Sequence, residues 1–195
     1  MRNKKFSLVY GVGINDSGIP TYHMIDGKKT QCPFYKRWVN ILERCYSEKW
    51  HKKYPTYKDC SVCDEWLFFS AFKLWMVAQD WEGNQIDKDI LLPGNKIYGP
   101  EECIFVSGKV NSLLIDCGSA RGNYPIGVTF NKRTGKFISR CMRNGKKVGI
   151  GSYDDELEAS KAYKSFKYKV INEVAESQEP RIRNALRVHA ELLLL

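Results

Sequence analysis

Residues 122–175 decide how we expect the chain to fold, and they read GNYPIGVTFNKRTGKFISRCMRNGKKVGIGSYDDELEASKAYKSFKYKVINEVA. Segments 122–128, 136–140 and 146–151 are short and rich in aromatic and β-branched residues, and Asn, Gly and Lys separate them, which is typical of strands joined by turns. From residue 153 the apolar residues follow a helical spacing. The stretch therefore predicts a three-stranded antiparallel sheet with one supporting helix, in a domain at residues 121–178. The expected buried face of the helix consists of Leu157, Ala162, Phe166, Val170 and Val174.

The three expected strands also carry an unusual concentration of positive charge. Between residues 121 and 151 there are eight basic side chains and no acidic one. A solvated surface normally mixes both signs, so this pattern favours contact with a polyanion. A sheet of this size fits the DNA major groove, where Arg reads guanine edges and Lys neutralises phosphates. The expected DNA-binding residues are Arg121, Lys132, Arg133, Lys136, Arg140, Arg143, Lys146 and Lys147.

The totals for the whole chain agree with a nucleic-acid partner. The chain has 195 residues, of which 43% are hydrophobic, and a net charge of +9. This length suits one or two small domains, and the basic balance favours double-stranded DNA. The seven Cys residues are scattered, and no apolar run is long enough for a signal peptide or a membrane span. We therefore expect a cytoplasmic protein with reduced thiols and no membrane partner.

The remaining segments suggest three further regions. Residues 1–33 predict a β-hairpin extension, with strands at 6–10 and 19–25. Apolar residues at helical spacing predict helices at 34–47 and 64–79, with a basic, aromatic loop at 48–60 between them. Residues 179–195 predict a closing helix that begins at Pro180, because Pro suits the first helical turn. We place the linker between the two main domains at residues 116–121.

Residues 85–114 form the second candidate site, and their pattern predicts a strand, a turn-rich loop, a strand and a helix. Asp87 and Asp89 flank Lys88 at the end of the first strand, and Asn95 and Asn111 follow. Carboxylate and amide oxygens suit Mg²⁺ or Mn²⁺, and a metal ion held against a phosphodiester can stabilise its leaving oxygen. An Asp-Lys-Asp triplet is, however, more often a solvated surface patch.

Zinc is not expected to stabilise this fold. Cys60 and Cys63 have the spacing of zinc ligands, but no second pair follows them, so another Cys would have to converge in space. The three His residues are far apart in the sequence and none lies within residues 85–114. His51 is the one that we consider able to approach Asp87 in the fold.

Two parts of the sequence resemble known families. The first resemblance, to phage and prophage HNH-type (His-Me finger) endonucleases that carry a C-terminal APETALA2-like domain, covers about residues 34–190. It rests on residues 44–46, Tyr57, residues 63–66, Phe69, Phe72, residues 87–89 and 94–103, Phe105, Val106 and Asn111. The second resemblance is to the APETALA2 domain itself and rests on residues 126–128, 136–140, 150–153 and 158–163.

These resemblances imply an α+β protein with four regions: an extension at 1–33, an HNH-like ββα-type module with flanking helices at 34–117, an APETALA2-like domain at 121–178, and the helix at 179–195. They imply Asp87, Lys88 and Asn95 as catalytic residues, and Asp87, Asp89 and Asn111 as ligands of Mg²⁺ or Mn²⁺. Lys88 stands where the family has its general-base His. A free Lys has a pKa of about 10.4 and would need burial or a neighbouring positive charge to serve as a base.

Two functional hypotheses follow from the sequence. The first is a sequence-directed, metal-dependent DNA endonuclease or nickase of phage type, in which the basic sheet positions the duplex. The second is a catalytically inactive DNA-binding protein. A third and remoter interpretation is a phage regulatory or counter-defence factor whose basic face meets an acidic protein surface.

Overall fold

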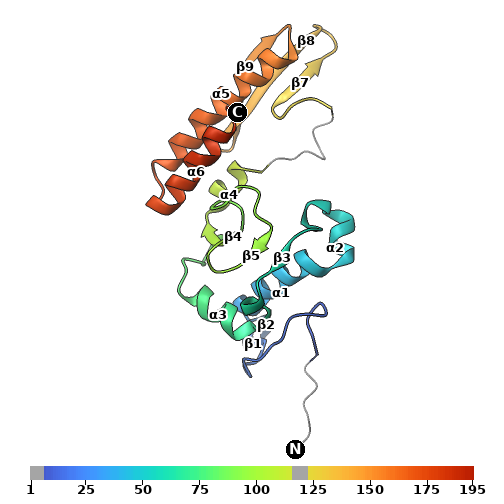
Figure 1. Cartoon of the computed structure of the whole chain (residues 1–195), viewed down its shortest axis with the longest axis vertical. Coiled ribbons are helices and arrows are strands. Elements are labelled where there is room, and N and C mark those ends of the chain that lie inside the picture. Colours follow the sequence, from blue (N-terminus) through green and yellow to red (C-terminus); the bar gives the residue numbers. More distant parts are fainter. Residues whose placement is uncertain (1–6, 116–122) are drawn as a thin grey trace, which may run out of the picture. The chain divides into compact units, whose positions relative to one another are not determined.

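The computed structural model describes residues 7–115 and 123–195, in two compact units that divide after Ser107 (Figure 1). Unit 1 is Met1–Ser107 and unit 2 is Gly108–Leu195. Helices and short sheets are mixed in both, so the expected α+β class is confirmed. The division precedes the expected linker at 116–121 and places α4 (Gly108–Leu113) in unit 2. Among the described residues, no helix is both long and apolar enough to span a membrane.

Helix α1 (Pro33–Tyr46) forms the centre of unit 1, as its apolar spacing predicts. Its buried residues are Trp38, Ile41, Leu42 and Cys45. Trp38 Nε1 donates a hydrogen bond of 2.7 Å to the carbonyl of Trp66. The indole therefore fills the core and also satisfies a buried backbone acceptor, which fixes the next segment against α1.

The expected loop at 48–60 is wrong, because most of it is helical. It contains α2 (Glu48–Lys53) and the 3₁₀ turn η1 (Pro55–Tyr57). The Ser47 hydroxyl accepts a hydrogen bond of 3.3 Å from the backbone N–H of Trp50, which is a helix N-cap. A short strand β3 (Ser61–Val62) follows and pairs in parallel with β5 (Ile97–Tyr98).

The helix expected at 64–79 is interrupted. It consists of the 3₁₀ turn η2 (Asp64–Leu67) and α3 (Phe69–Val77), with Phe68 extended between them. Ile14 inserts at this break: its N–H donates to the carbonyl of Leu67 at 2.8 Å, and its carbonyl accepts from Phe69 N–H at 3.0 Å. The N-terminal segment thus supplies the hydrogen bonds that a continuous helix would make internally.

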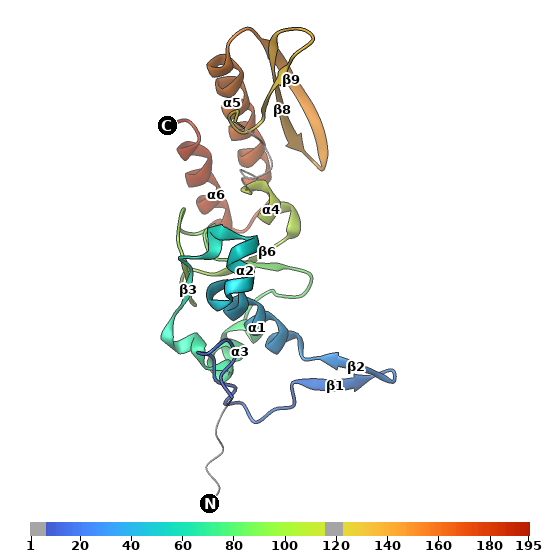
Figure 2. The ribbon, with the colours of Figure 1, turned by 90° about the vertical axis from the view of Figure 1, so that its right-hand side faces the viewer.

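The N-terminal hairpin joins different segments of the chain from those expected. The strands are β1 (Tyr22–Ile25) and β2 (Lys28–Gln31), joined by Asp26 and Gly27, whose φ angles of 49° and 73° suit a two-residue hairpin turn. The strand expected at 6–10 is absent from the described part of that segment, where Val9 pairs only with Gly13 across a tight turn. Figure 2 shows β1 and β2 extending away from α1.

The order expected for residues 85–114 is confirmed. Strand β4 (Gln85–Asp87) pairs antiparallel with β6 (Ile104–Val106), a loop that includes β5 joins them, and α4 follows. The ring of Phe105 on β6 stacks on Trp75 of α3, with the centroids 5.6 Å apart. This contact attaches the strand pair to the helical core of unit 1 and fixes the position of Asp87 at the end of β4.

Unit 2 contains the expected antiparallel sheet in the order β7 (Val128–Asn131), β8 (Lys136–Arg143) and β9 (Lys146–Tyr153). Helix α5 (Glu156–Ala175) packs on this sheet, and α6 (Pro180–Leu192) packs on α5 (Figure 2). The Asp155 side chain caps α5 by accepting from Glu158 N–H at 2.9 Å. The expected burial of Leu157 is wrong, since 61% of it is exposed. The buried face of α5 consists of Ala159, Tyr163, Val170, Ile171, Val174 and Ala175.

Candidate functional site

Most of the excess positive charge lies in unit 2. Residues 108–195 contain 16 Lys and Arg and 9 Asp and Glu, a net charge of +7, whereas residues 1–107 contain 15 and 13, a net charge of +2. The two units therefore differ electrostatically, and unit 2 is the one suited to a polyanion.

One face of the unit 2 sheet is covered by α5. Ser139 and Cys141 on β8 are buried, and Arg143, two residues further on, reaches Glu173 of α5. Its Nε and Nη2 donate to the two carboxylate oxygens of Glu173 at 3.1 and 2.9 Å. Because side chains alternate along a strand, these three residues identify the helix-covered face of β8.

The opposite face presents Arg140 of β8, which is exposed. Arg140 is paired across the sheet with Gly149, and Met142 with Lys147, so the register places Lys147 beside Arg140 on this side. A Cβ built on Gly149 would meet no atom within 4 Å, so the backbone is bare there. Small side chains follow on the same side: Thr129 and Ser152 both oppose Ile138 of β8. We call this side the outer face; it presents Arg140, Lys147 and the bare backbone at Gly149, and it also carries the half-exposed Met142.

Of the other expected DNA-binding residues that the structure describes, Lys136 shares the side of β8 that carries Arg140, and the rest lie in a turn or near a strand end. Lys132 and Arg133 are exposed in the turn between β7 and β8, and Lys146 is exposed at the start of β9. Lys136 forms an ion pair of 2.9 Å with Asp154, and Arg143 forms one of 2.9 Å with Glu173. Both acidic partners lie outside residues 121–151, the span that contains no acidic residue. Arg121 lies outside the described residues.

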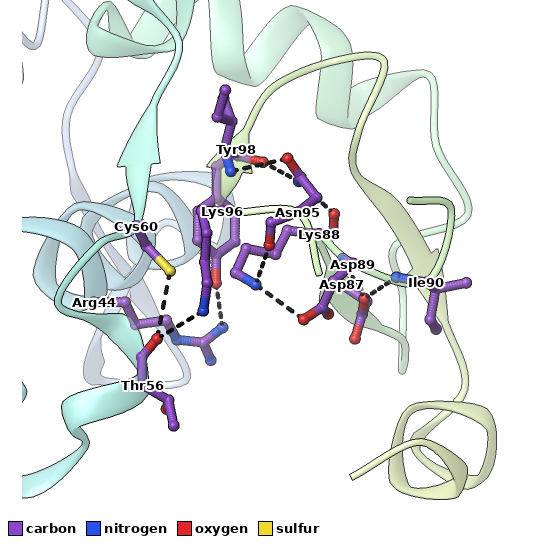
Figure 3. A network of polar contacts seen from close by, with 11 residues as sticks. Arg44, Thr56, Cys60, Asp87, Lys88, Asp89, Ile90, Asn95, Lys96 and Tyr98 are labelled. Atoms are coloured by element: carbon purple, nitrogen blue, oxygen red, sulfur yellow. Dashed lines mark hydrogen bonds and ion pairs between the residues drawn. The ribbon is translucent and has the colours of Figure 1, made fainter. Parts of the chain in front are cut away.

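In unit 1 the Asp87-Lys88-Asp89 triplet turns inward at Lys88. Only 7% of Lys88 is exposed, and its Nζ donates to Asp89 Oδ2 at 3.0 Å and to the carbonyl of Asn95 at 2.8 Å (Figure 3). Asp87 Oδ1 accepts from the backbone N–H groups of Asp89 and Ile90 at 2.9 and 2.8 Å. The alternative interpretation, a solvated surface patch, therefore does not hold for Lys88. The triplet forms a turn around its buried ammonium group.

Asn95 organises the loop that receives Lys88. Its Nδ2 donates to the carbonyls of Lys88 and Ile97, both at 2.7 Å, and its Oδ1 accepts from Ile97 N–H at 3.1 Å. Each of its polar side-chain atoms therefore bonds to backbone. This geometry gives Asn95 a structural role in closing the 88–97 loop.

The two carboxyl groups of the triplet are coupled. Burial, and then the charge of Asp89, raise the pKa of Asp87 to about 6. Burial opposes ionisation of Asp89 as well, but hydrogen bonds from Asp87 and Lys88 outweigh it and lower the Asp89 pKa. The pair thus shares a proton more readily than two separate carboxyl groups would, with Asp89 as the ionised partner.

Three of the oxygen atoms around the expected metal site accept hydrogen bonds from the protein: Asp87 Oδ1, Asp89 Oδ2 and Asn95 Oδ1. The donor to Asp89 is the Lys88 ammonium group, which brings a positive charge to the side of the carboxylate. Asn111, the third expected ligand, lies on α4. Among the described residues no three His, Cys, Asp or Glu side chains cluster as metal ligands.

The structure adds residues to this site that the sequence did not indicate. Arg44, from the last turn of α1, donates to the Tyr98 hydroxyl at 3.5 Å, and Lys96 Nζ donates to the Thr56 carbonyl at 3.3 Å (Figure 3). His51, which the sequence leaves able to approach residues 85–111, places Nε2 2.9 Å from the carbonyl of Arg44. No sequence spacing could have revealed this cluster, because its members come from three separate segments.

Comparison of the chain with models of protein families, with characterised proteins and with solved structures gives no match. The two features of the chain with a bearing on function are the outer face of the unit 2 sheet and the turn at residues 87–89.

Proposed function

We propose that the protein binds double-stranded DNA through the outer face of the unit 2 sheet. The observation that carries this proposal is that Arg140 and Lys147 lie on the same side of the sheet, next to Gly149, where the backbone is bare. Neither cation has a carboxylate within 4.0 Å among the described residues. A three-stranded sheet with this surface can approach base edges closely, and its guanidinium group can pair with guanine.

Arg140 and Lys147 have different expected roles, which makes the proposal specific. A bidentate Arg–guanine contact discriminates against other bases by about 1–3 kcal/mol. A Lys–phosphate contact adds affinity for any duplex and contributes about 0.9 to the slope of log K against log salt. The protein would therefore be sequence-directed through Arg140 and held on the backbone through Lys147.

The test is duplex binding measured by fluorescence anisotropy over a series of salt concentrations. A preferred duplex, selected from a random library, is compared with an unrelated one. Arg140→Ala should reduce the difference between the two duplexes, whereas Lys147→Ala should weaken both equally and lower the salt slope by about 0.9. The matched control is Arg143→Ala, on the same strand but bonded to Glu173. Wild-type affinity that hardly changes with salt would contradict the proposal.

A second candidate function is metal-dependent cleavage of DNA by an endonuclease or nickase. One observation favours it: Asp87 and Asp89 lie side by side at the end of β4, in a partly buried and electrostatically coupled pair. Against it stands the Lys88 ammonium group, which would have to move before a metal ion could bind both carboxylates. The geometry thus supports DNA binding without cleavage better than it supports catalysis.

Nicking of supercoiled plasmid in Mg²⁺ or Mn²⁺ distinguishes the two candidates. Nicking by the wild type that Asp87→Ala abolishes would establish cleavage at this site. Equal nicking by both proteins would place the activity elsewhere. An absence of nicking by a preparation that binds duplex would leave the protein as a DNA-binding protein without nuclease activity.

A further inference from the structure

Three cations in unit 1 converge on one small region. They are Arg44 from α1, Lys88 after β4 and Lys96 before β5, and Figure 3 shows their side chains in one region with the Thr56 carbonyl and the Cys60 thiol. The Thr56 carbonyl accepts from Lys96 Nζ at 3.3 Å and from Cys60 Sγ at 3.9 Å.

The charges of these cations act on two thiols of the same region. Burial raises the pKa of Cys45 to about 12, and the charges of Lys88 and Arg44 oppose this rise. Burial also raises the pKa of Cys60, against the charges of Lys88 and Lys96. The charge of Lys88 therefore acts on both thiols, together with Arg44 at Cys45 and with Lys96 at Cys60.

The positive charge in this region is only partly compensated. Lys88 pairs with Asp89 at 3.0 Å, but among the described residues neither Arg44 nor Lys96 has a carboxylate within 4.0 Å. The partners of the Arg44 guanidinium group are the Tyr98 hydroxyl at 3.5 Å and the Tyr57 ring, whose centroid is 5.8 Å away. A guanidinium group has five N–H donors in a planar fork that matches the oxygen atoms of a phosphate, so this environment leaves it suited to an anion.

We propose that Arg44 and Lys96 bind one backbone phosphate of DNA, and that the buried Lys88 ammonium group, which is bonded to Asp89 and Asn95, supports them with its charge where a divalent cation was expected. Arg44 would hold two phosphate oxygens through its fork, and the exposed Lys96 would close the site from the solvent side. The site takes an anion where the sequence pattern alone predicts a cation. This inference rests on the proposed DNA binding and adds a second contact, in unit 1.

The test uses the full-length protein and a fluorescein-labelled duplex of random sequence, with binding measured over a series of salt concentrations. Lys96→Ala should weaken binding several-fold at low salt and reduce the salt slope by about 0.9, which is the effect of one lost phosphate contact. Arg44→Gln should weaken binding at least as much. The matched control is Lys36→Ala on α1, which is exposed and makes no side-chain bond among the described residues. Binding should be retained in EDTA, because no metal ion is needed.

The outcomes separate this inference from the proposed function. If the wild type does not bind duplex at all, both fail. If the wild type binds and depends on Arg140 and Lys147, but Lys96→Ala keeps the wild-type slope, only the phosphate site is overturned. Binding that is lost in EDTA would also overturn it, since a metal ion would then fill the role given to Lys88. Because Lys96 is exposed, its substitution should leave the Trp fluorescence of unit 1 unchanged.

Discussion

Gly127 lies directly against the ring of Tyr163, so closely that no Cβ atom fits between β7 and α5. Its φ angle of 78° is also one that L-residues rarely adopt. Gly127→Ala should therefore lower the free energy of unfolding of unit 2 by about 2–4 kcal/mol, from backbone strain and overpacking together. Urea unfolding followed by far-UV circular dichroism measures this loss.

Gly135→Ala is the matched control for that prediction. Gly135 also has a positive φ, 65°, but a Cβ atom there would meet nothing within 4 Å. Only the backbone strain remains, so a loss of about 1 kcal/mol is expected. Equal losses for the two variants would mean that contact with Tyr163 does not constrain the position of α5 on the sheet.

Asp87→Asn should stabilise unit 1 at neutral pH. The folded-state pKa of Asp87, about 6, lies above its unfolded value of about 3.9, so the folded state binds the proton more tightly. Stability of the wild type is therefore lost as pH rises from about 4 to about 6. The neutral Asn escapes this loss and keeps an oxygen to accept from Asp89 and Ile90. A gain of about 2 kcal/mol is expected above pH 6, and little below pH 4.

Tryptophan fluorescence is the suitable probe, because all five Trp residues lie in unit 1. Urea unfolding of wild type and variant is followed at intervals from pH 4 to pH 8. A difference in stability that stayed constant over this range would show that Asp87 titrates as an ordinary carboxyl group.

Sequence patterns predicted the elements whose formation depends on residues close together in the chain. The three strands and the helix of unit 2 follow from turn residues and periodicity, and the order of elements around Asp87 was also correct. The break at Phe68 was not predictable, because the hydrogen bonds that stabilise it come from Ile14, more than fifty residues earlier. Leu157 was misplaced because helical spacing identifies an apolar stripe, while the sheet decides which part of it is covered.

The same limit applies to the candidate sites. The sequence located the basic span but not the carboxylates of Asp154 and Glu173 that pair with two of its members. It placed Asp87, Lys88 and Asp89 at the end of a strand, but it did not indicate that Lys88 turns inward. The strand ends at Asp87, and the backbone turn that follows lets Lys88 reach Asp89 and the carbonyl of Asn95.

Asn95→Ala should destabilise unit 1 whether or not a divalent cation is present. The substitution removes two hydrogen bonds of 2.7 Å to the carbonyls of Lys88 and Ile97. A loss of about 2 kcal/mol is expected from Trp fluorescence during urea unfolding in EDTA. Asn40→Ala, at an exposed position of α1, should change stability by less than about 0.5 kcal/mol. An effect of Asn95→Ala that appeared only with Mg²⁺ would instead identify Asn95 as a metal ligand.

Ser139→Ala should stabilise unit 2. Ser139 has no exposed surface, and its hydroxyl group finds no hydrogen-bond partner among the described residues. A buried hydroxyl without a partner costs about 1–3 kcal/mol, whereas the methyl group of Ala fits the same space without that cost. Ser139 lies on the helix-covered face of β8, opposite Val128, where no polar group is needed. We expect a gain of about 1 kcal/mol by circular dichroism during urea unfolding. Ser152→Ala, on the outer face, should have almost no effect, and a loss of stability in Ser139→Ala would show that the hydroxyl group is bonded in solution.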